Sequence, residues 1–318
     1  MCSPMPGCSL VDGPPVRRCE EIRLDTRQGG LAGLAWRREG AARVLALHGW
    51  LDNAASFVPL GPLLAQLDLV ALDLPGHGHS EHRHASARYH FIDYLFSVDA
   101  ALNALGWTDC HILGHSMGAS IAACYAAAAP ERLRSLVLLD GLGPLAAPPT
   151  KTAERVRRSL QKARQGSREP RLFGSLDEMV KARQQASGLA EPAARLICQR
   201  SARQQGRHFA WRSDPALNWI SSLVMVEEQV LDLLRHIECP TLTYEVTPAS
   251  SWFTREQVEA RKTAVAHAEH RVFEGDHHFH MDAPEAIAET IQAFILQNDA
   301  PHLRDNPNES TNPLPDQA

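Results

Sequence analysis

The feature of this sequence that most constrains its fold is a series of short apolar runs separated by longer amphipathic stretches. Four of the runs are almost unbroken, at residues 44–47, 69–72, 110–113 and 136–139. Runs of this length that are apolar throughout are typical of strands buried on both faces of a parallel sheet. Four further strands are predicted, the first two as an antiparallel hairpin at the start, at residues 20–25, 31–36, 241–244 and 271–273.

Helical patterns lie between these runs, and two of the helices carry start signals. Thr254 and Gln257 have the spacing of a capping box, which predicts a helix over residues 255–267. Near the end, Asp282 is expected to be the N-cap of a helix that has Pro284 as an early residue. Strands that alternate with helices predict an α/β fold.

The alternation stops between residues 143 and 227, where helix formers and arginine dominate and no strand pattern is visible. We therefore expect a helical insertion at 143–227 within a core made of 19–142 and 228–297. Residues 1–18 are expected to be flexible. Residues 298–318, which are rich in Asn, Pro and Asp, are expected to be disordered.

Composition and charge exclude several classes of protein. The net charge of −5 over 318 residues provides no basic field for nucleic acid. No apolar stretch approaches the roughly 18 residues of a membrane-spanning helix, and the first 18 residues contain no apolar core of a secretory signal. Seven scattered cysteines without a CxxC pair predict neither a disulfide framework nor a zinc site, and favour a reduced, cytoplasmic chain.

The sequence contains two histidine clusters that are candidates for metal ligands. Neither contains a cysteine or a pair of carboxylates at ligand spacing, so no metal site is predicted from them. The clusters are His77, His79, His82 and His84, and then His277, His278 and His280.

The charge is unevenly distributed. Residues 151–212 contain 15 Lys and Arg against 5 Asp and Glu, a net of +10, which leaves −15 for the rest of the chain. One interpretation is a solvated basic helix face. The other is a cap that overhangs the active site and attracts an anionic substrate.

The strongest motif for chemistry is Gly114-His115-Ser116-Met117-Gly118. It follows one predicted strand directly and precedes a helix of small residues, 119–129. In this context G-x-S-x-G makes a sharp turn that raises the serine hydroxyl above the edge of the sheet. Serine is a weak nucleophile at neutral pH, so Ser116 requires a nearby base and an acid that orients the base.

A second motif, His48-Gly49-Trp50, ends the strand at 44–47. The loop at this position and the residue after the nucleophile each supply a backbone N–H to an oxyanion hole. We therefore predict the amides of Trp50 and Met117 as its donors. Asp52 and Asn53 are expected to stabilise this loop. The Gly- and Pro-rich loop at 73–80 is expected to be structural, including Asp73, His77 and His79.

Together with Gly275-Asp276-His277, these motifs resemble the α/β-hydrolase fold family over roughly residues 20–297. The sequences at 48–54, at 138–140 and around Trp252-Phe253 resemble the serine hydrolase-like proteins within it. The resemblance implies an eight-stranded, mostly parallel sheet with a helical cap after the sixth strand. It also implies a hydrolase without metal or organic cofactor, in which Ser, acid and His follow in chain order.

The resemblance also indicates the base and the acid. The family's base lies in a G-x-H turn seven residues before a Pro-Glu helix start, which selects His277, with His278 as the alternative and His280 as a packing residue. Most relatives carry the acid after the seventh strand, but the loop here, from Glu245 to Ser251, has no Asp. A minority carry it after the sixth strand, which selects Asp140. Glu245 is the alternative acid, and a turn carboxylate is the structural alternative for Asp140.

These assignments predict a serine hydrolase that cleaves a carboxylic ester or thioester through an acyl-enzyme. Two alternatives remain: another reaction of the same residues, such as that of a hydroxynitrile lyase, C–C hydrolase or perhydrolase, and a non-catalytic binding protein. Several aromatic residues are candidates for an apolar acyl pocket or for the cap core: Phe173, Phe209, Trp211, Trp219, Trp252 and Phe253.

Overall fold

The computed structural model describes residues 19–165, 171–219, 221–248 and 252–299. The predicted flexible segment at 1–18 and residues 300–318 of the predicted tail lie outside this part of the chain. The first two residues of the expected tail are placed: Asn298 is the C-cap of the last helix, and Asp299 pairs with Arg134 at 2.8 Å. These two residues are therefore part of the described structure, and the prediction for the rest of the tail falls outside it.

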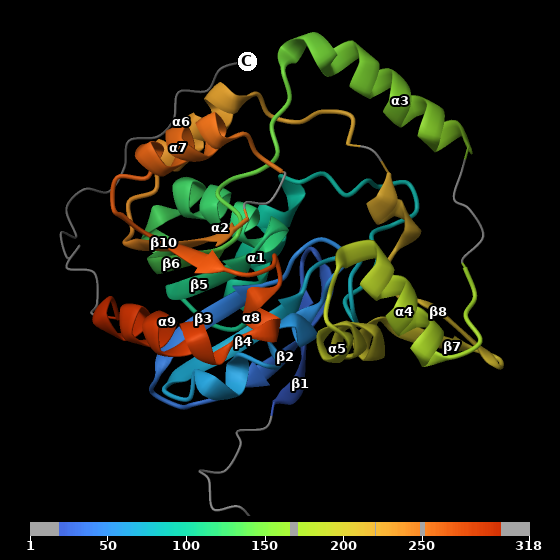
Figure 1. Cartoon of the computed structure of the whole chain (residues 1–318), viewed down its shortest axis with the longest axis horizontal. Coiled ribbons are helices and arrows are strands. Elements are labelled where there is room, and N and C mark those ends of the chain that lie inside the picture. The colour runs from blue at the N-terminus through green and yellow to red at the C-terminus, as the bar shows by residue number, and fades with distance from the viewer. Residues whose placement is uncertain (1–18, 166–170, 220, 249–251, 300–318) are drawn as a thin grey trace, which may run out of the picture.

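An eight-stranded sheet forms the centre of the molecule, as predicted (Figure 1). Its order is β1-β2-β4-β3-β5-β6-β9-β10, and the pairs β1–β2 and β2–β4 are antiparallel while the other pairs are parallel. The strands are β1 Glu20–Thr26, β2 Gly29–Trp36, β3 Ala42–Leu47, β4 Leu67–Asp73, β5 Cys110–His115, β6 Leu133–Leu139, β9 Thr241–Thr247 and β10 Ala268–Glu274.

Burial on both faces explains the unbroken apolar runs. In β3, Leu45 and Leu47 belong to one apolar core, whereas Val44 and Ala46 belong to the core on the opposite face. Successive side chains of a strand point to opposite faces, so a strand covered on both sides needs apolar residues at every position.

Helices cover both faces. One core includes side chains of α1, α2 and α6, and the other includes side chains of η1 and α9. The helices are α1 Asp93–Ala104, α2 Met117–Ala128, α3 Thr152–Gln165, α4 Leu176–Ser187, α5 Glu191–Ser201, α6 Glu227–Arg235, α7 Arg255–Ala264, α8 Phe279–Asp282 and α9 Glu285–Gln297. Short 3-10 helices are η1 Ala54–Phe57, η2 Gly61–Leu63, η3 Pro130–Arg132, η4 Pro149–Lys151 and η5 Pro215–Asn218.

The two predicted helix starts differ in outcome. The capping box is confirmed: the Thr254 side chain accepts from the Gln257 amide, and the Gln257 side chain accepts from the Thr254 amide. The prediction for Asp282 was wrong, because Asp282 ends the short helix α8 and Pro284 is the N-cap of α9. The single turn of α8 takes up the residues that would otherwise cap α9.

Residues 143–227 contain α3, α4 and α5, but they are not entirely helical. Strands β7 (Ala202–Gln205) and β8 (His208–Trp211) form an antiparallel hairpin within this segment. Gly206 has φ +58°, a left-handed conformation that glycine adopts without strain, and it allows the tight turn. Each strand has only four residues, and β7 is polar after its first residue, so the hairpin does not form a clear strand pattern in the sequence.

Helices α4 and α5 and the hairpin form one group beside the sheet, whereas α3 lies apart from this group (Figure 1). A small core of its own holds that group together, and Met281 of α8 joins it. Within the described ranges, no helix combines the length and apolar character needed to cross a bilayer.

A buried ion pair connects this group to the sheet. Arg200 of α5 donates from Nε to both carboxylate oxygens of Asp73, at 2.9 Å each, and Asp73 is fully buried at the end of β4. Asp73 also accepts the amides of Ala54 and His79, at 2.8 Å each. The structure thus gives Asp73 the structural role that the sequence suggested.

We expect Arg200→Met to lower the free energy of unfolding by about 3–5 kcal/mol, since it leaves the buried Asp73 carboxylate without its counter-charge. Equilibrium unfolding in urea measures the loss. Arg195→Met is the matched control, because Arg195 lies on the same helix but pairs with exposed carboxylates of Asp177 and Glu191. A loss for Arg200→Met no larger than that of the control would contradict a stabilising role for the buried pair.

Candidate active site

Three residues singled out in the sequence meet at one edge of the sheet. Ser116 follows β5, Asp140 follows β6, and His277 lies three residues after β10. These strands belong to the parallel part of the sheet, so their carboxyl ends lie at the same edge. Ligands of open α/β sheets bind at this edge.

Backbone strain is concentrated at the same edge. Leu51, Ser116 and Asp140 are the non-glycine residues with positive φ in the described chain, at 60°, 53° and 45°. Hydrogen bonds hold two of them: the Ser116 amide donates to Leu139 O at 2.9 Å, and the Asp140 amide donates to Tyr244 O at 2.8 Å. Strain of this kind persists only where the surrounding structure imposes it, and it is common at functional sites.

The glycines of the G-x-S-x-G turn allow two backbones to approach closely. A Cβ on Gly118 would collide with the carbonyl of Leu47 on β3, and a Cβ on Gly114 would lie 2.5 Å from Ala119 Cα. Helix α2 can therefore start directly against the sheet, which places Ser116 in the sharp turn before it.

A continuous line of hydrogen bonds connects Ser116, His277 and Asp140. His277 Nε2 lies 2.9 Å from Ser116 Oγ, and His277 Nδ1 is hydrogen-bonded to Asp140 Oδ2. An ionised carboxylate only accepts, so Nδ1 carries the proton and Nε2 is free to accept the hydroxyl proton. This is the arrangement in which a serine, a base and an orienting acid work together.

The alternative base and acid have other partners. Glu245 forms an ion pair with Lys262 of α7 at 2.6 Å. His278 Nε2 lies 3.2 Å from Asp52 Oδ2, and His280 Nε2 lies 2.7 Å from Ser56 Oγ. His280 is fully buried, and this burial, together with the charge of His278, lowers its pKa to about 3.

The two predicted oxyanion donors lie in the segments that follow the neighbouring strands β3 and β5. Met117 is the first residue of α2, where backbone N–H groups have no partner within the helix. Trp50 lies in the turn after β3, which the Asp52 amide closes by donating to Gly49 O at 3.1 Å. Asn53 stabilises the same loop by capping η1 and donating to Ile197 O, at 2.9 Å for each bond.

A buried polar cluster lies beside His277 and was not recognised in the sequence. It consists of Asp52, His115, His278 and Arg183, and Arg183 binds Asp52 Oδ1. Burial of His115, followed by the charges of His280, His277 and His278, lowers its pKa well below the usual range. Burial alone would raise the pKa of Asp52, but the hydrogen bond and charge of His278 and the charge of Arg183 outweigh it, so this pKa is also well below its usual range. The four residues come from four separate segments, so no spacing in the sequence indicates the cluster.

Most of the aromatic candidates are engaged elsewhere. Phe173 and Trp211 pack edge to face, with ring centroids 5.6 Å apart, and Phe209 packs on the same small core. Trp219 covers the guanidinium of Arg88, and Phe253 covers that of Arg261. Trp252 is the candidate beside the site, since its ring centroid lies 6.3 Å from that of His277 and its side chain is largely exposed.

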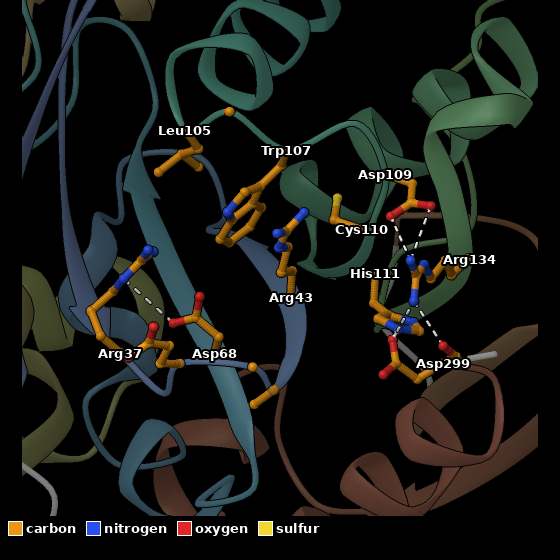
Figure 2. A pocket seen from close by; sticks show the side chains of 14 residues that line it. Arg37, Arg43, Asp68, Leu105, Trp107, Asp109, Cys110, His111, Arg134 and Asp299 are labelled. Atoms are coloured by element: carbon orange, nitrogen blue, oxygen red, sulfur yellow. Dashed lines mark hydrogen bonds and ion pairs between the residues drawn. The ribbon is translucent and has the colours of Figure 1, made fainter. Parts of the chain in front are cut away.

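A cavity of about 430 Å³ lies at the opposite edge of the sheet (Figure 2). Residues near the starts of β3 and β5 line it, including Arg43 and Cys110, and Trp107 and Arg134 also point toward it. Its lining does not include Ser116, Asp140 or His277. The cavity is therefore separate from the candidate active site.

Comparisons with known proteins agree with this architecture. A family model described as the alpha/beta hydrolase fold matches residues 42–284. A serine hydrolase-like protein of Dictyostelium discoideum is 30% identical over 299 residues, covering 87% of this chain and 82% of the relative. A similar protein of Danio rerio is 30% identical over 292 residues, covering 88% and 89%.

Solved structures show the same fold. A hypothetical protein of Pseudomonas aeruginosa PAO1 superposes with a TM-score of 0.82 at 33% identity, covering 87% of this chain and 99% of that one. A thioesterase domain from the curacin biosynthetic pathway has a TM-score of 0.76 at 24% identity, covering 86% and 99%. The strand order, the turn at Ser116 and these similarities lead to one conclusion: the chain belongs to the α/β-hydrolase family, within its serine hydrolase-like subgroup.

Proposed function

We propose that this protein is a serine hydrolase that cleaves a carboxylic ester or thioester through an acyl-enzyme, with Ser116, His277 and Asp140 as its catalytic residues. The observation that carries the proposal is the 2.9 Å contact between Ser116 Oγ and His277 Nε2, combined with the bond from His277 Nδ1 to Asp140. The hydrolase fold and the thioesterase domain among its structural neighbours support it.

In the acylation step, Ser116 Oγ attacks the substrate carbonyl while His277 Nε2 takes the hydroxyl proton. Asp140 keeps the imidazole in the reactive tautomer and stabilises the imidazolium that forms. His277 then gives the proton to the departing alcohol or thiol. In deacylation His277 activates a water molecule, which releases the acid and restores the Ser116 hydroxyl.

The amides of Trp50 and Met117 are proposed to bind the oxyanion of each tetrahedral intermediate. One such donor contributes roughly 3–4 kcal/mol to the stability of the transition state. Residues 143–227 are proposed to act as the cap over this site. Ion pairs that join this segment to loops near the carboxyl edge, Arg183 with Asp52 and Arg200 with Asp73, support that placement.

The basic charge of the cap is partly neutralised by pairing. Arg183, Arg195 and Arg200 all contact carboxylates. Helix α3 adds further arginines on an exposed surface, including Arg157 and Arg158, and it has no buried residue. We propose α3 as the source of any attraction for an anionic substrate.

The nucleophile is tested by labelling with a fluorophosphonate probe. We expect Ser116→Ala to abolish labelling and to reduce ester hydrolysis at least about a thousandfold, since the covalent route is lost. Ser159→Ala is the control, because Ser159 lies on α3 and bonds to Ser222. Intact protein that fails to label would favour a binding protein, and labelling without ester or thioester turnover would favour another reaction of the same residues.

The acid is tested by two conservative variants. Asp140→Asn should lower kcat by about 10⁴-fold, because an amide can hold His277 in the wrong tautomer. Glu245→Gln should stay within a few-fold of the native rate, since Glu245 pairs with Lys262. Circular dichroism checks that both variants fold. Near-normal turnover of Asp140→Asn, or a large loss for Glu245→Gln, would overturn the assignment of Asp140.

Steering by the cap is tested with two esters of equal acyl length, one anionic and one neutral. We expect kcat/KM for the anionic ester to fall more steeply as salt rises from low to physiological ionic strength, where the Debye length is about 8 Å. The double variant Arg157→Gln with Arg158→Gln should reduce the difference. Equal salt responses of the two esters would show that the basic face of α3 is only solvated.

A further inference from the structure

We propose that Asp52, His115 and His278 form a site for a single divalent transition-metal ion of the zinc type, and that an ion bound there inhibits the hydrolase. The site is distinct from Ser116, His277 and Asp140 but lies beside them. In the described part of the chain, one carboxylate oxygen and two ring nitrogens of these residues all lie within 4.8 Å of one another.

The spacing of the donor atoms fits a small tetrahedral ion. Two ligands that are each about 2.0–2.1 Å from a tetrahedral zinc lie about 3.3 Å apart. Asp52 Oδ2 is 3.2 Å from His278 Nε2 and 3.8 Å from His115 Nδ1. The first distance matches this spacing and the second exceeds it by about half an ångström, and two histidines with one carboxylate are a known ligand set for zinc.

His115 is already oriented as a ligand. Its Nε2 lies 2.9 Å from the carbonyl oxygen of His277, which only accepts, so Nε2 carries the ring proton. Nδ1 therefore presents a lone pair toward the Asp52 carboxylate, and this fully buried nitrogen has no hydrogen-bond partner among the residues that the structure describes. The lone pair and the carboxylate repel each other when no proton lies between them, and a cation bound to both removes this repulsion.

The second bond of each ligand is of the kind that supports metal sites. A ligating histidine usually donates its other N–H to a carbonyl or carboxylate, as His115 does to His277 O. Arg183 holds Asp52 Oδ1 and leaves Oδ2 directed at the two imidazoles. The positive charge of Arg183 also reduces the attraction for a further cation, which suits reversible binding rather than a permanent structural ion.

Gly49 lies directly beside two of the donor atoms. A Cβ on Gly49 would lie 3.0 Å from Asp52 Oδ2 and 3.1 Å from His115 Nδ1, so a side chain at this position would crowd the site. His278 is 7% exposed and forms the side of the site nearest to solvent. On binding, the Nε2 lone pair of His278 coordinates the ion and the neutral ring carries its proton on Nδ1 instead.

Inhibition follows from the position of His277. Its ring centroid lies 4.7 Å from that of His115 and 5.1 Å from that of His278. The proposed mechanism places a positive charge on His277 in the transition state, and a divalent cation this near opposes that charge. Occupancy should therefore lower kcat at least tenfold with little change in KM. This effect, unlike binding, rests on the proposed function.

Binding is tested first, by titrating Zn²⁺ into the full-length Ser116→Ala protein in a calorimeter. We expect one ion per chain at micromolar concentration. Adding His278→Gln or Asp52→Asn should weaken binding at least tenfold, whereas adding His236→Gln, an exposed histidine at the end of α6, should leave it unchanged. Melting curves verify folding. Absence of micromolar binding, or equal affinity in folded His278→Gln, would overturn the site.

Inhibition is tested second, on the hydrolysis of a chromogenic ester by native protein and by His278→Gln, each compared with its own rate in EDTA. We expect Zn²⁺ to inhibit the native protein reversibly and to require at least tenfold more metal in the variant. Binding without loss of kcat would overturn the inhibitory role and leave the site. Protein that shows no ester hydrolysis in EDTA but retains zinc binding would refute the proposed function instead.

Discussion

The position of β5 between β3 and β6 is the constraint on which the rest of the molecule depends. Because α2 starts where its backbone touches the end of β3, the turn between β5 and α2 has almost no freedom. The amide of Ser116 is tied to the last residue of β6, and the amide of Asp140 is tied to β9. These bonds hold residues in strained conformations, so the strain at the carboxyl edge is a direct result of close packing inside the sheet.

Electrostatics links the segment at 143–227 to this edge. Its arginines contribute most of its positive charge, and two of them enter the buried surface to meet Asp52 and Asp73. Removing either partner would leave a charge in an environment of low dielectric, which is costly. The arginines of this segment therefore fall into two groups. Those on α4 and α5 that pair with Asp52 and Asp73 stabilise the fold, whereas those on α3 are exposed.

Four histidines lie close together near Ser116: His115, His277, His278 and His280. Five of the six pairs of these rings have centroids between 4.1 and 6.1 Å apart, so positive charges on several of the rings would repel one another. Burial, and then the neighbouring imidazoles, hold His115 and His280 neutral. The neutral ring of His115 is therefore available for coordination at the neighbouring site.

Much of this structure could be predicted from local patterns. The eight strands and the capping box at Thr254 could be predicted from the sequence, because the spacing of apolar residues and the capping of a helix depend on residues close in the chain. The start of α9 was misplaced and the β7–β8 hairpin was missed. Both depend on packing rather than on local preference: α8 takes up Asp282, and the hairpin is stabilised by pairing of Phe209 with Phe173.

The motif at Ser116 and its flanking strand and helix were enough to indicate a hydrolase fold, since a tight turn of this kind requires small residues at fixed positions. The resemblance to the family indicated His277 and Asp140 as the partners of Ser116 and left His278 and Glu245 as alternatives. The tertiary structure distinguishes them, because it joins His277 and Asp140 to the serine by hydrogen bonds and pairs Glu245 with Lys262. The cluster of Asp52, His115 and His278 was invisible for the same reason: its members are far apart in sequence, and only the convergence of parallel strands at one edge brings them within bonding distance.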